Sequence, residues 1–465
     1  TIDPAFLSRI GEVVQWALDA GMYVMLNMHH DTNWIFHMEK NYDAVLAQYS
    51  AAWTQIAHYF KNWPLTLMFE GLNEPRFSHD WNEDQPHYFE YVDTLYTTFH
   101  SIVRSSGGNN AVRPLVLSTI TGAPTETRLQ ELAKTITKLN DDNLIATIHY
   151  YGYWPFSVNI AGATKFDNNV RLDIVGAFER AHRIFVSQGV PVIIGEFGLL
   201  GFDKDLGTIQ RGEILKFFEY VTYYAQEKEM PLMLWDNGQH FQRRRLVWGD
   251  EGLYNIIMVT GGRSSYTNSD SIFIRKGSEI KNRSLLLELN GNELLSIELD
   301  GEPLKLGMDY TVTNRYLTFP SEFLQKLVQT ADPDHCGVAA TLTCHFSHGA
   351  PWEIFVITYE LPVLADVEGR TGRFHIPTSF NGDRLATMEA VYKDGRNAGP
   401  QDWTSYKEFG SAFSPLYDRE VIEITPAFFK ETKDGEILLR FHFWSGAIIE
   451  YSLEKRGATV VGRSL

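Results

Sequence analysis

Six short apolar runs divide the first half of the chain, and more polar stretches separate them. The runs cover residues 22–28, 66–72, 114–120, 144–150, 190–196 and 231–235. Runs this continuously apolar are typical of parallel strands buried on both faces. Helical patterns alternate with them at residues 42–62, 86–105, 171–189 and 211–228, and a first helix begins near Pro4. The alternation predicts an α/β fold, a (β/α)8 TIM barrel.

A barrel of this type has eight strands, and this sequence shows six. The first helix precedes the first visible strand, so the two absent strands belong on the N-terminal side of Thr1. A barrel without them would have two open edges and an unfilled interior. We therefore expect that the first strands are missing from this sequence, and that the chain is either truncated or continues before Thr1.

The pattern changes after residue 258. Residues 259–270 are rich in Gly, Ser, Thr and Asn, which indicates a linker or loop. Short alternating strands separated by turn signals follow, first up to about residue 362 and again from 363 to the end. We predict three domains: a catalytic (β/α)8 barrel at 1–262, an immunoglobulin-like β-sandwich at 263–362 and a second all-β sandwich at 363–465.

Charge and composition exclude several classes of partner. The formal net charge is −17, which argues against nucleic acid and anionic membranes, because phosphate binding needs a basic surface. No run of 18 apolar residues occurs, so we expect no membrane-spanning segment. Aromatic residues make up 13 % of the chain, which suits either stacking on sugar rings or a large aromatic core. Cys336 and Cys344 lie on one extended segment, too far apart for a disulfide, and we expect two free thiols.

Two glutamates stand at the ends of different buried strands. Glu74 lies in Leu-Asn-Glu-Pro after the run 66–72, and Glu196 lies in Gly-Glu-Phe-Gly at the end of the run 190–196. A carboxylate near an apolar interior loses solvation, so it needs a partner or a function. Face to face, the two would form a glycoside-cleaving pair, with Glu74 as general acid and Glu196 as nucleophile. The alternative for either residue is a buried structural ion pair with an arginine.

Further polar and aromatic side chains follow the same strands. Asn73 could hydrogen-bond a sugar hydroxyl, and His149 and Tyr151 share one face by their i, i+2 spacing. Tyr151 could orient Glu196, and His149 could bind a sugar hydroxyl. Trp235, at the end of the last strand, would form the apolar floor under the sugar at the point of cleavage.

Two more places could bind substrate. His29, His30 and Asp31 end the first visible strand, and we expect them to bind substrate rather than a metal, because no further ligand cluster supports a metal site. Trp403 lies in a polar loop of the last segment, where an exposed ring is costly unless it meets a partner. It either stacks on sugar or packs against another domain. Trp34, Trp81 and Trp154 could extend a groove or could simply anchor loops.

Together these motifs resemble glycoside hydrolase family 5. The strings Leu-Asn-Glu-Pro, His-x-Tyr, Gly-Glu-Phe-Gly and Trp-Asp-Asn-Gly occur in this order at strand ends. The His-His-Asp string at 29–31 and the segment 149–156 look like subfamily 4, whose members cleave β-1,4-glucans, mixed-linkage β-glucan and xyloglucan. Residues 290–294 and 306–312 look like an immunoglobulin-like X2 module, and the final segment resembles a family 46 carbohydrate-binding module.

The resemblance implies a secreted, extracellular endo-β-1,4-glucanase that acts on cellulose, mixed-linkage β-glucan and xyloglucan by retaining double displacement, as a monomer without a cofactor. Glu74 matches the acid/base and Glu196 the nucleophile. The substrate-contacting positions match His29, Asn73, His149, Tyr151 and Trp235. Trp403 is the candidate for completing the cleft from the last module. An arginine that supports the nucleophile on the family's second strand has no match here. The alternatives are a mannanase of the same clan and, for a truncated barrel, a non-catalytic carbohydrate-binding protein.

Overall fold

The computed structural model describes residues 2–30, 32–330 and 336–465, so Asp31 of the predicted His-His-Asp string lies outside the described residues. The chain divides into two compact units. The first contains the residues up to Tyr151 together with Asp173–Phe197 and Tyr224–Trp235. The second contains Gly152–Leu172, Gly198–Tyr223 and Asp236–Leu465.

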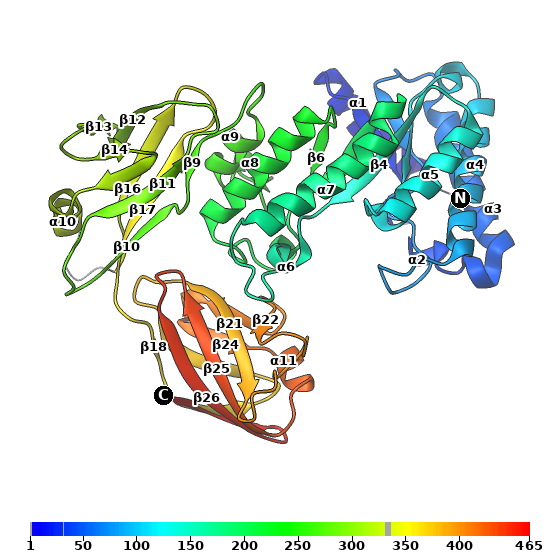
Figure 1. Cartoon of the computed structure of the whole chain (residues 1–465). Helices are drawn as coiled ribbons and strands as arrows, with labels where there is room; N and C mark the ends of the chain where they lie inside the picture. The colour runs from blue at the N-terminus through cyan, green and yellow to red at the C-terminus, as the bar shows by residue number, and fades with distance from the viewer. Residues whose placement is uncertain (1, 31, 331–335) are drawn as a thin grey trace. The chain divides into compact units, whose positions relative to one another are not determined.

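A six-stranded parallel sheet forms the centre of the first unit and curls into a half-barrel (Figure 1). The strands pair in chain order, which confirms the predicted α/β architecture. They are β1 (Val24–Asn27), β2 (Leu67–Glu70), β3 (Leu115–Ser118), β4 (Leu144–Tyr150), β5 (Val192–Phe197) and β6 (Leu232–Leu234). Several are shorter than the apolar runs that predicted them, because the ends of those runs lie outside the part of the sheet in which the strands pair.

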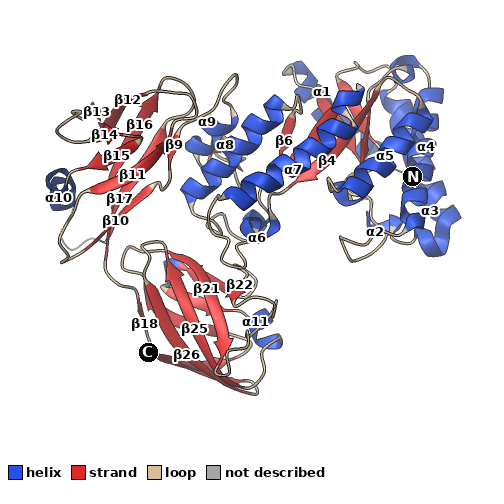
Figure 2. Ribbon diagram, in the orientation of Figure 1, coloured by secondary structure: helices blue, strands red, loops and turns tan. Residues whose placement is uncertain are grey.

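Helices alternate with these strands (Figure 2). The long ones are α1 (Pro4–Asp19), α3 (Met38–Phe60), α4 (Pro86–Ser105), α5 (Glu126–Leu139), α7 (Asn168–Ile184) and α8 (Arg211–Glu227), with short α2 (Thr32–Ile35), α6 (Trp154–Ser157) and α9 (Glu251–Ile257). Asp3 caps α1 by accepting hydrogen bonds from two backbone amides, as its position predicts. Helix α5 was not among the predicted stretches.

Aromatic side chains of the helices fasten the carboxyl ends of the strands. The Tyr49 hydroxyl and the Trp53 indole of α3 both donate to the Gly71 carbonyl, at 3.1 and 3.3 Å. The Tyr96 hydroxyl of α4 donates to the Ser118 carbonyl at 2.7 Å. These bonds satisfy buried carbonyls where the sheet ends, and so hold in place the loops that carry the site.

One arginine fastens the opposite ends of the strands. Arg113 is 0 % exposed, and its guanidinium donates to the backbone carbonyls of Phe60, Trp63, Pro64 and Leu67 and to the Asn110 side chain. Burial lowers the pKa of Arg113 to about 10. All five donors of a guanidinium therefore serve one junction, between α3 and the strands β2 and β3.

The second unit holds two β-rich regions, as predicted. In the first, one sheet has the order β10-β17-β16-β12-β13 and the other β14-β15-β11-β9. These strands are β9 (Tyr266–Thr267), β10 (Ser271–Arg275), β11 (Arg283–Glu288), β12 (Leu294–Leu299), β13 (Glu302–Pro303), β14 (Thr311–Thr313), β15 (Tyr316–Phe319), β16 (Gly337–Phe346) and β17 (Trp352–Tyr359), with α10 at Ser321–Thr330. Both cysteines are free thiols, and burial raises the pKa of Cys344 to about 12.

The last region also has two sheets, in the orders β18-β20-β24-β23 and β19-β27-β26-β25-β21-β22. They enclose a continuous apolar core that includes Phe374, Met388 and Phe441. The strands are β18 (Val363–Leu364), β19 (Val367–Arg370), β20 (Phe374–Ser379), β21 (Leu385–Tyr392), β22 (Tyr406–Lys407), β23 (Phe413–Leu416), β24 (Val421–Ile424), β25 (Gly435–Phe443), β26 (Ile448–Arg456) and β27 (Thr459–Ser464), with α11 at Pro426–Lys430. Across the described residues, no helix combines the length and apolarity that a bilayer crossing requires.

Candidate active site

The two predicted glutamates meet at the carboxyl ends of the parallel strands. Glu74 follows β2 and Glu196 belongs to β5. One carboxylate oxygen of each lies within 4.8 Å of the other and of a ring nitrogen of His149, from β4. The sheet order explains this meeting, since parallel strands direct all their carboxyl ends to one rim. The spacing fits the roughly 5 Å separation of the carboxyl groups in retaining glycosidases.

A register shift at Gly195 directs Glu196 toward this centre. Ile148 of β4 pairs with Ile194 of β5, but the next residue, His149, pairs with Glu196. Gly195 is therefore the extra residue of a β-bulge. A Cβ built on Gly195 would approach the Thr147 Oγ1 far more closely than the 3.0 Å that real Cβ atoms respect. Only glycine fits between the two strands here, and this makes Gly195 a site residue that the sequence analysis did not single out.

A second glycine makes room for the His149 ring. Gly122, at the end of a short 3-10 turn after β3 (Ile120–Gly122), has a φ of +69°. A Cβ there would lie 2.7 Å from the His149 Cγ, and a Cβ on Gly195 would lie 3.4 Å from its Cδ2. His149 is 6 % exposed, so the ring is packed between two backbone segments without side chains. Its position is thereby restricted.

Hydrogen bonds link the three groups. The Tyr151 hydroxyl donates to Glu196 Oε2 at 2.6 Å. His149 Nδ1 lies 2.8 Å from Glu74 Oε1 and 3.3 Å from Glu196 Oε2. Tyr151 therefore contacts one carboxylate of the pair, and His149 contacts both.

These contacts set the proton affinities. Burial raises the pKa of Glu196, while the charge of His149 and the Tyr151 hydrogen bond act in the opposite direction. Burial by itself would lower the pKa of His149, but the Glu74 hydrogen bond and the charges of Glu196 and Glu74 outweigh it, so that the pKa is raised. The charge of Glu196 thus depends on these two neighbours.

A chain of amides extends the site toward β1. Asn27, at the end of β1, donates from Nδ2 to Glu70 Oε2 at 2.6 Å and to Asn73 Oδ1 at 3.3 Å. Asn73 is buried beside Glu74, and its carbonyl oxygen is engaged by Asn27. The amide group of Asn73 is thereby oriented, since an amide that accepts through its oxygen presents its two N–H donors on the other side.

His29 and Trp235 come from the two edge strands of the sheet, yet their rings stack. Their centroids are 5.5 Å apart and their planes differ by 7°. His29 follows β1 and Trp235 follows β6, so the curl of the sheet brings the residues after its two edge strands into contact at this rim. His30 is exposed and meets His29 edge-on at 5.1 Å. The rings of His29, His30 and Trp235 thus form one cluster at the carboxyl ends of the edge strands.

Trp403 belongs to the second unit, where its ring faces Trp154. The two centroids are 6.3 Å apart with the planes tilted by 40°. Trp403 is 59 % exposed and Trp154 is 44 % exposed. Trp403 thus contacts a residue of the predicted catalytic domain while much of its ring stays exposed, and both alternatives, sugar stacking and packing against another domain, stay predictions. The pair forms an exposed aromatic surface shared by the segment after β4 and the last β-rich region.

Glu74, His149 and Glu196 are the one group of side chains, within the described ranges, whose ligand atoms could surround a metal ion. Each of the three already has a partner: His149 hydrogen-bonds Glu74 and pairs with Glu196, and Tyr151 donates a hydrogen bond to Glu196. A metal would have to replace the contacts of His149 with both carboxylates. The arrangement as it stands suits a pair of carboxylates of which one acts as acid/base and the other as nucleophile.

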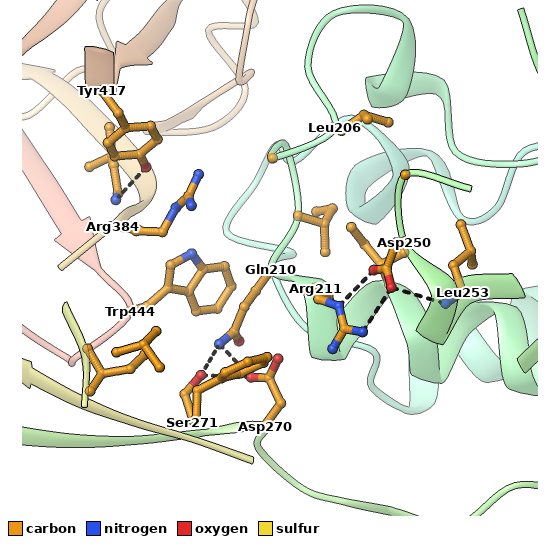
Figure 3. A pocket seen from close by; sticks show the side chains of 18 of the residues that line it. Leu206, Gln210, Arg211, Asp250, Leu253, Asp270, Ser271, Arg384, Tyr417 and Trp444 are labelled. Carbon is orange, nitrogen blue, oxygen red and sulfur yellow. Dashed lines mark hydrogen bonds and ion pairs between the residues drawn. The ribbon is translucent and has the colours of Figure 1, made fainter. Parts of the chain in front are cut away.

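The second unit also contains a cavity of about 690 Å³ (Figure 3). Its lining includes Phe355, Tyr417 and Trp444, and none of the predicted site residues takes part. Several of its polar groups are already paired: Arg211 Nε donates to Asp250 at 2.7 Å, and Gln210 Nε2 donates to Asp270 at 2.8 Å and Ser271 at 3.0 Å. The two carboxylates in its lining, Asp250 and Asp270, are thus both held by neighbouring side chains.

Comparison with known families assigns the three regions. Residues 1–241 match the model of cellulase (glycosyl hydrolase family 5), residues 266–356 match carbohydrate binding domain X2, and residues 360–463 match the carbohydrate binding domain CBM46. Endoglucanase B of Paenibacillus lautus is 51 % identical over 463 residues, which cover 99 % of this chain and 81 % of that protein.

Solved structures show the same organisation. The tri-modular endo-β-1,4-glucanase B (Cel5B) of Bacillus halodurans superposes with a TM-score of 0.97 at 48 % identity, over 100 % of this chain and 87 % of that one. A tri-modular subfamily 4 endo-β-1,4-glucanase of Bacillus licheniformis, complexed with cellotetraose, has a TM-score of 0.82 at 28 % identity, over 100 % of this chain and 86 % of that one. The chain therefore belongs to glycosyl hydrolase family 5, as an endoglucanase whose cellulase domain is followed by an X2 domain and a CBM46 domain.

Proposed function

We propose that the enzyme hydrolyses internal β-1,4-glucosidic bonds of cellulose, mixed-linkage β-glucan and xyloglucan, with retention of configuration. The observation that carries this proposal is the separation of at most 4.8 Å between carboxylate oxygens of Glu74 and Glu196. An inverting mechanism requires space for a water between one carboxylate and the sugar, and this distance leaves none. The distance suits direct attack by a carboxylate instead.

In the first step, Glu196 attacks the anomeric carbon while Glu74 transfers its proton to the departing glycosidic oxygen. The C–O bond to the leaving sugar breaks and a glycosyl ester of Glu196 forms. In the second step, Glu74, now ionised, takes a proton from a water that attacks the same carbon and releases Glu196. Both carboxyl groups end in their starting states, and no cofactor takes part.

The neighbouring groups support this cycle. Tyr151 donates to the Glu196 oxygen at 2.6 Å and so stabilises the carboxylate that must attack. His149, in contact with both glutamates, can respond to the charge that moves between them during the cycle. We assign substrate contacts to Asn73, His29, His30, His149 and Trp235, since all of these surround the carboxylate pair or continue its rim. Trp403, with Trp154, would extend the binding surface for polymeric chains.

At the level of the whole chain, we propose a three-domain enzyme with the divisions 1–262, 263–362 and 363–465. Its partner is polysaccharide, as its carbohydrate binding domains indicate. We further propose that it is extracellular and acts as a monomer. A mannanase is the second candidate from the same clan, and equal activity on mannan and β-glucan would favour it.

The test separates the two carboxylate roles by chemical rescue. Glu74→Ala and Glu196→Ala are assayed on an aryl β-cellobioside with and without azide. Glu74→Ala should still form the glycosyl ester, since an aryl leaving group needs little protonation, and azide should then yield a β-glycosyl azide. Glu196→Ala should give an α-glycosyl azide, because azide replaces the missing nucleophile. Glu12→Ala, which removes an exposed carboxylate on α1, is the matched control.

Reducing-sugar release from carboxymethylcellulose, barley β-glucan, xyloglucan and mannan then ranks the substrates. Azide products of the same configuration from both variants would refute the assigned roles. Inactivity of a folded wild-type chain on all four polymers and on the aryl cellobioside would refute the proposed function and favour a carbohydrate-binding protein.

A further inference from the structure

Lys407 is a lysine with no exposed surface, and it lies beneath the loop that carries Trp403. It ends β22, and its Nζ donates to three backbone carbonyls: Pro400 at 3.0 Å, Gln401 at 3.3 Å and Thr404 at 2.7 Å. An ammonium group has three N–H donors, so the number of donors equals the number of carbonyls. All three carbonyls flank Trp403 within the same short loop.

Two further hydrogen bonds hold this loop in place. Asn397 Nδ2 donates to the Asp402 carbonyl at 2.7 Å, and Gln401 Nε2 donates to Glu408 Oε2 at 3.1 Å. Gln401 has a left-handed φ of +51°, a backbone conformation that needs such support in a residue other than glycine. The backbone on both sides of Trp403 is therefore fixed, although the ring itself is exposed.

The same region is bonded to the segment that carries Trp154. Asn159, buried with a φ of +53°, donates from Nδ2 to the Thr208 and Ala386 carbonyls, both at 2.8 Å, and its own carbonyl accepts from the Phe409 amide at 3.1 Å. Lys204 also pairs with Glu408. Within the second unit, the Trp403 loop and the Trp154 segment are thus held together at several points.

We propose that Lys407 is a positioning residue for substrate specificity: it holds the Trp403 ring beside Trp154, so that the two rings bind long or branched β-glucan chains as one preformed surface. The inference rests on the proposed β-glucanase function. A loop that is free before binding must be ordered when the substrate arrives, and this weakens binding. Lys407 removes that loss while staying out of contact with the substrate itself.

The protonation state of Lys407 supplies an independent readout. Burial lowers its pKa to about 8, and the charge of Asp402 opposes this shift. The other charged groups nearby are already engaged: Glu408 with Lys204, and Glu389 of the paired strand β21 with His442. A deprotonated amine has two donors and a lone pair, so above this pKa one carbonyl of the loop loses its bond.

The first experiment uses the full-length Lys407→Met, Trp403→Ala and double variants. Lys407→Met should raise KM for xyloglucan about 3- to 10-fold, the range expected for loss of one aromatic contact, and leave kcat on an aryl β-cellobioside unchanged. In the Trp403→Ala background, the Lys407→Met substitution should have no additional effect on KM. Lys393→Met, which removes an exposed lysine from the same domain, is the control and should match the wild type.

Additive effects of the two substitutions, or an equal loss on xyloglucan and aryl cellobioside, would overturn the proposal. If Lys407→Met does not fold, the pH dependence of the wild-type enzyme still tests the proposal. Its KM for xyloglucan, relative to that for aryl cellobioside, should rise as the pH passes about 8, and this rise should be absent from Trp403→Ala. A flat ratio in the wild type would overturn the inference. Failure of the wild type to cleave aryl cellobioside would instead refute the proposed function.

Discussion

Substituting Gly195 by alanine would add one methyl group at the bulge that directs Glu196 toward Glu74. The new Cβ would collide with the Thr147 Oγ1 on the adjacent strand, at a distance that real Cβ atoms do not adopt. Thr147 is fully buried, so its side chain has little space in which to turn away. The substitution therefore requires β4 and β5 to separate locally, or Glu196 to shift with its strand.

The magnitude follows from that displacement. Restoring van der Waals contact needs a movement of about 1 Å. A misplacement of this size at a catalytic group lowers kcat/KM about 100-fold, which corresponds to about 2.7 kcal/mol of transition-state stabilisation. Overpacking of a buried site also lowers the free energy of unfolding by about 1 to 3 kcal/mol. Both effects should appear in Gly195→Ala.

The assay is the kcat/KM for an aryl β-cellobioside, with urea unfolding measured in parallel. Gly195→Ala combined with Thr147→Ala should recover most of both losses, because the shorter side chain leaves room for the new methyl group. Gly195→Ala combined with Thr147→Val should not recover, since valine keeps a γ-carbon where the hydroxyl was. Wild-type kinetics in the single variant, or equal behaviour of the two double variants, would refute the steric reasoning.

Three further substitutions test the contacts around the site and the base of the sheet. Tyr151→Phe removes a hydrogen bond to a carboxylate, which is worth about 1.5 to 3 kcal/mol, so kcat should fall about 10- to 100-fold. Because this bond lowers the pKa of Glu196, its loss should also move the acid limb of the kcat/KM profile to higher pH. Because the pKa of His149 is raised in the folded protein, His149 contributes stability that is fully present below its ordinary pKa of 6.5 and is lost as the pH rises through the folded-state pKa. Thermal melts of the wild type should show this decline in stability with pH, and melts of His149→Gln should not. Arg113→Met leaves four backbone carbonyls without their donor and should lower the free energy of unfolding in urea by about 3 to 5 kcal/mol. An unchanged urea midpoint of unfolding would contradict the proposed role of Arg113 in joining α3 to the sheet.

The order of helices and strands could be predicted because the hydrophobic pattern of each short segment determines it. Continuous apolar runs mark strands buried on both faces, and the change to short alternating segments after residue 258 marks the β-rich regions. The pattern does not fix the ends of the strands: the run 66–72 yields a strand of only Leu67–Glu70. Beyond Glu70, the Gly71 amide still donates to the Val116 carbonyl, but its own carbonyl accepts from the Tyr49 and Trp53 side chains of α3 instead of from a strand.

Contacts between distant residues could not be predicted with the same detail. That His149 reaches both Glu74 and Glu196 depends on a one-residue register shift at Gly195 and on the space left by Gly122. Lys407 reads as an ordinary surface lysine in a polar loop, yet it is fully buried under Trp403. No sequence pattern distinguishes these cases, because the partners of His149 lie on other strands and the burial of Lys407 depends on how the preceding loop folds over it.

The three-part organisation, the parallel-strand architecture and the two strand-end glutamates follow from the sequence alone, since hydrophobic period and strand-end position are properties of short segments. Only the tertiary structure decided that the carboxylate oxygens lie within 4.8 Å, that the His29 and Trp235 rings stack across the two edges of the curled sheet, and that Trp403 faces Trp154. Those distances depend on sheet curl, register and domain packing, which are properties of the whole folded chain and of no segment within it.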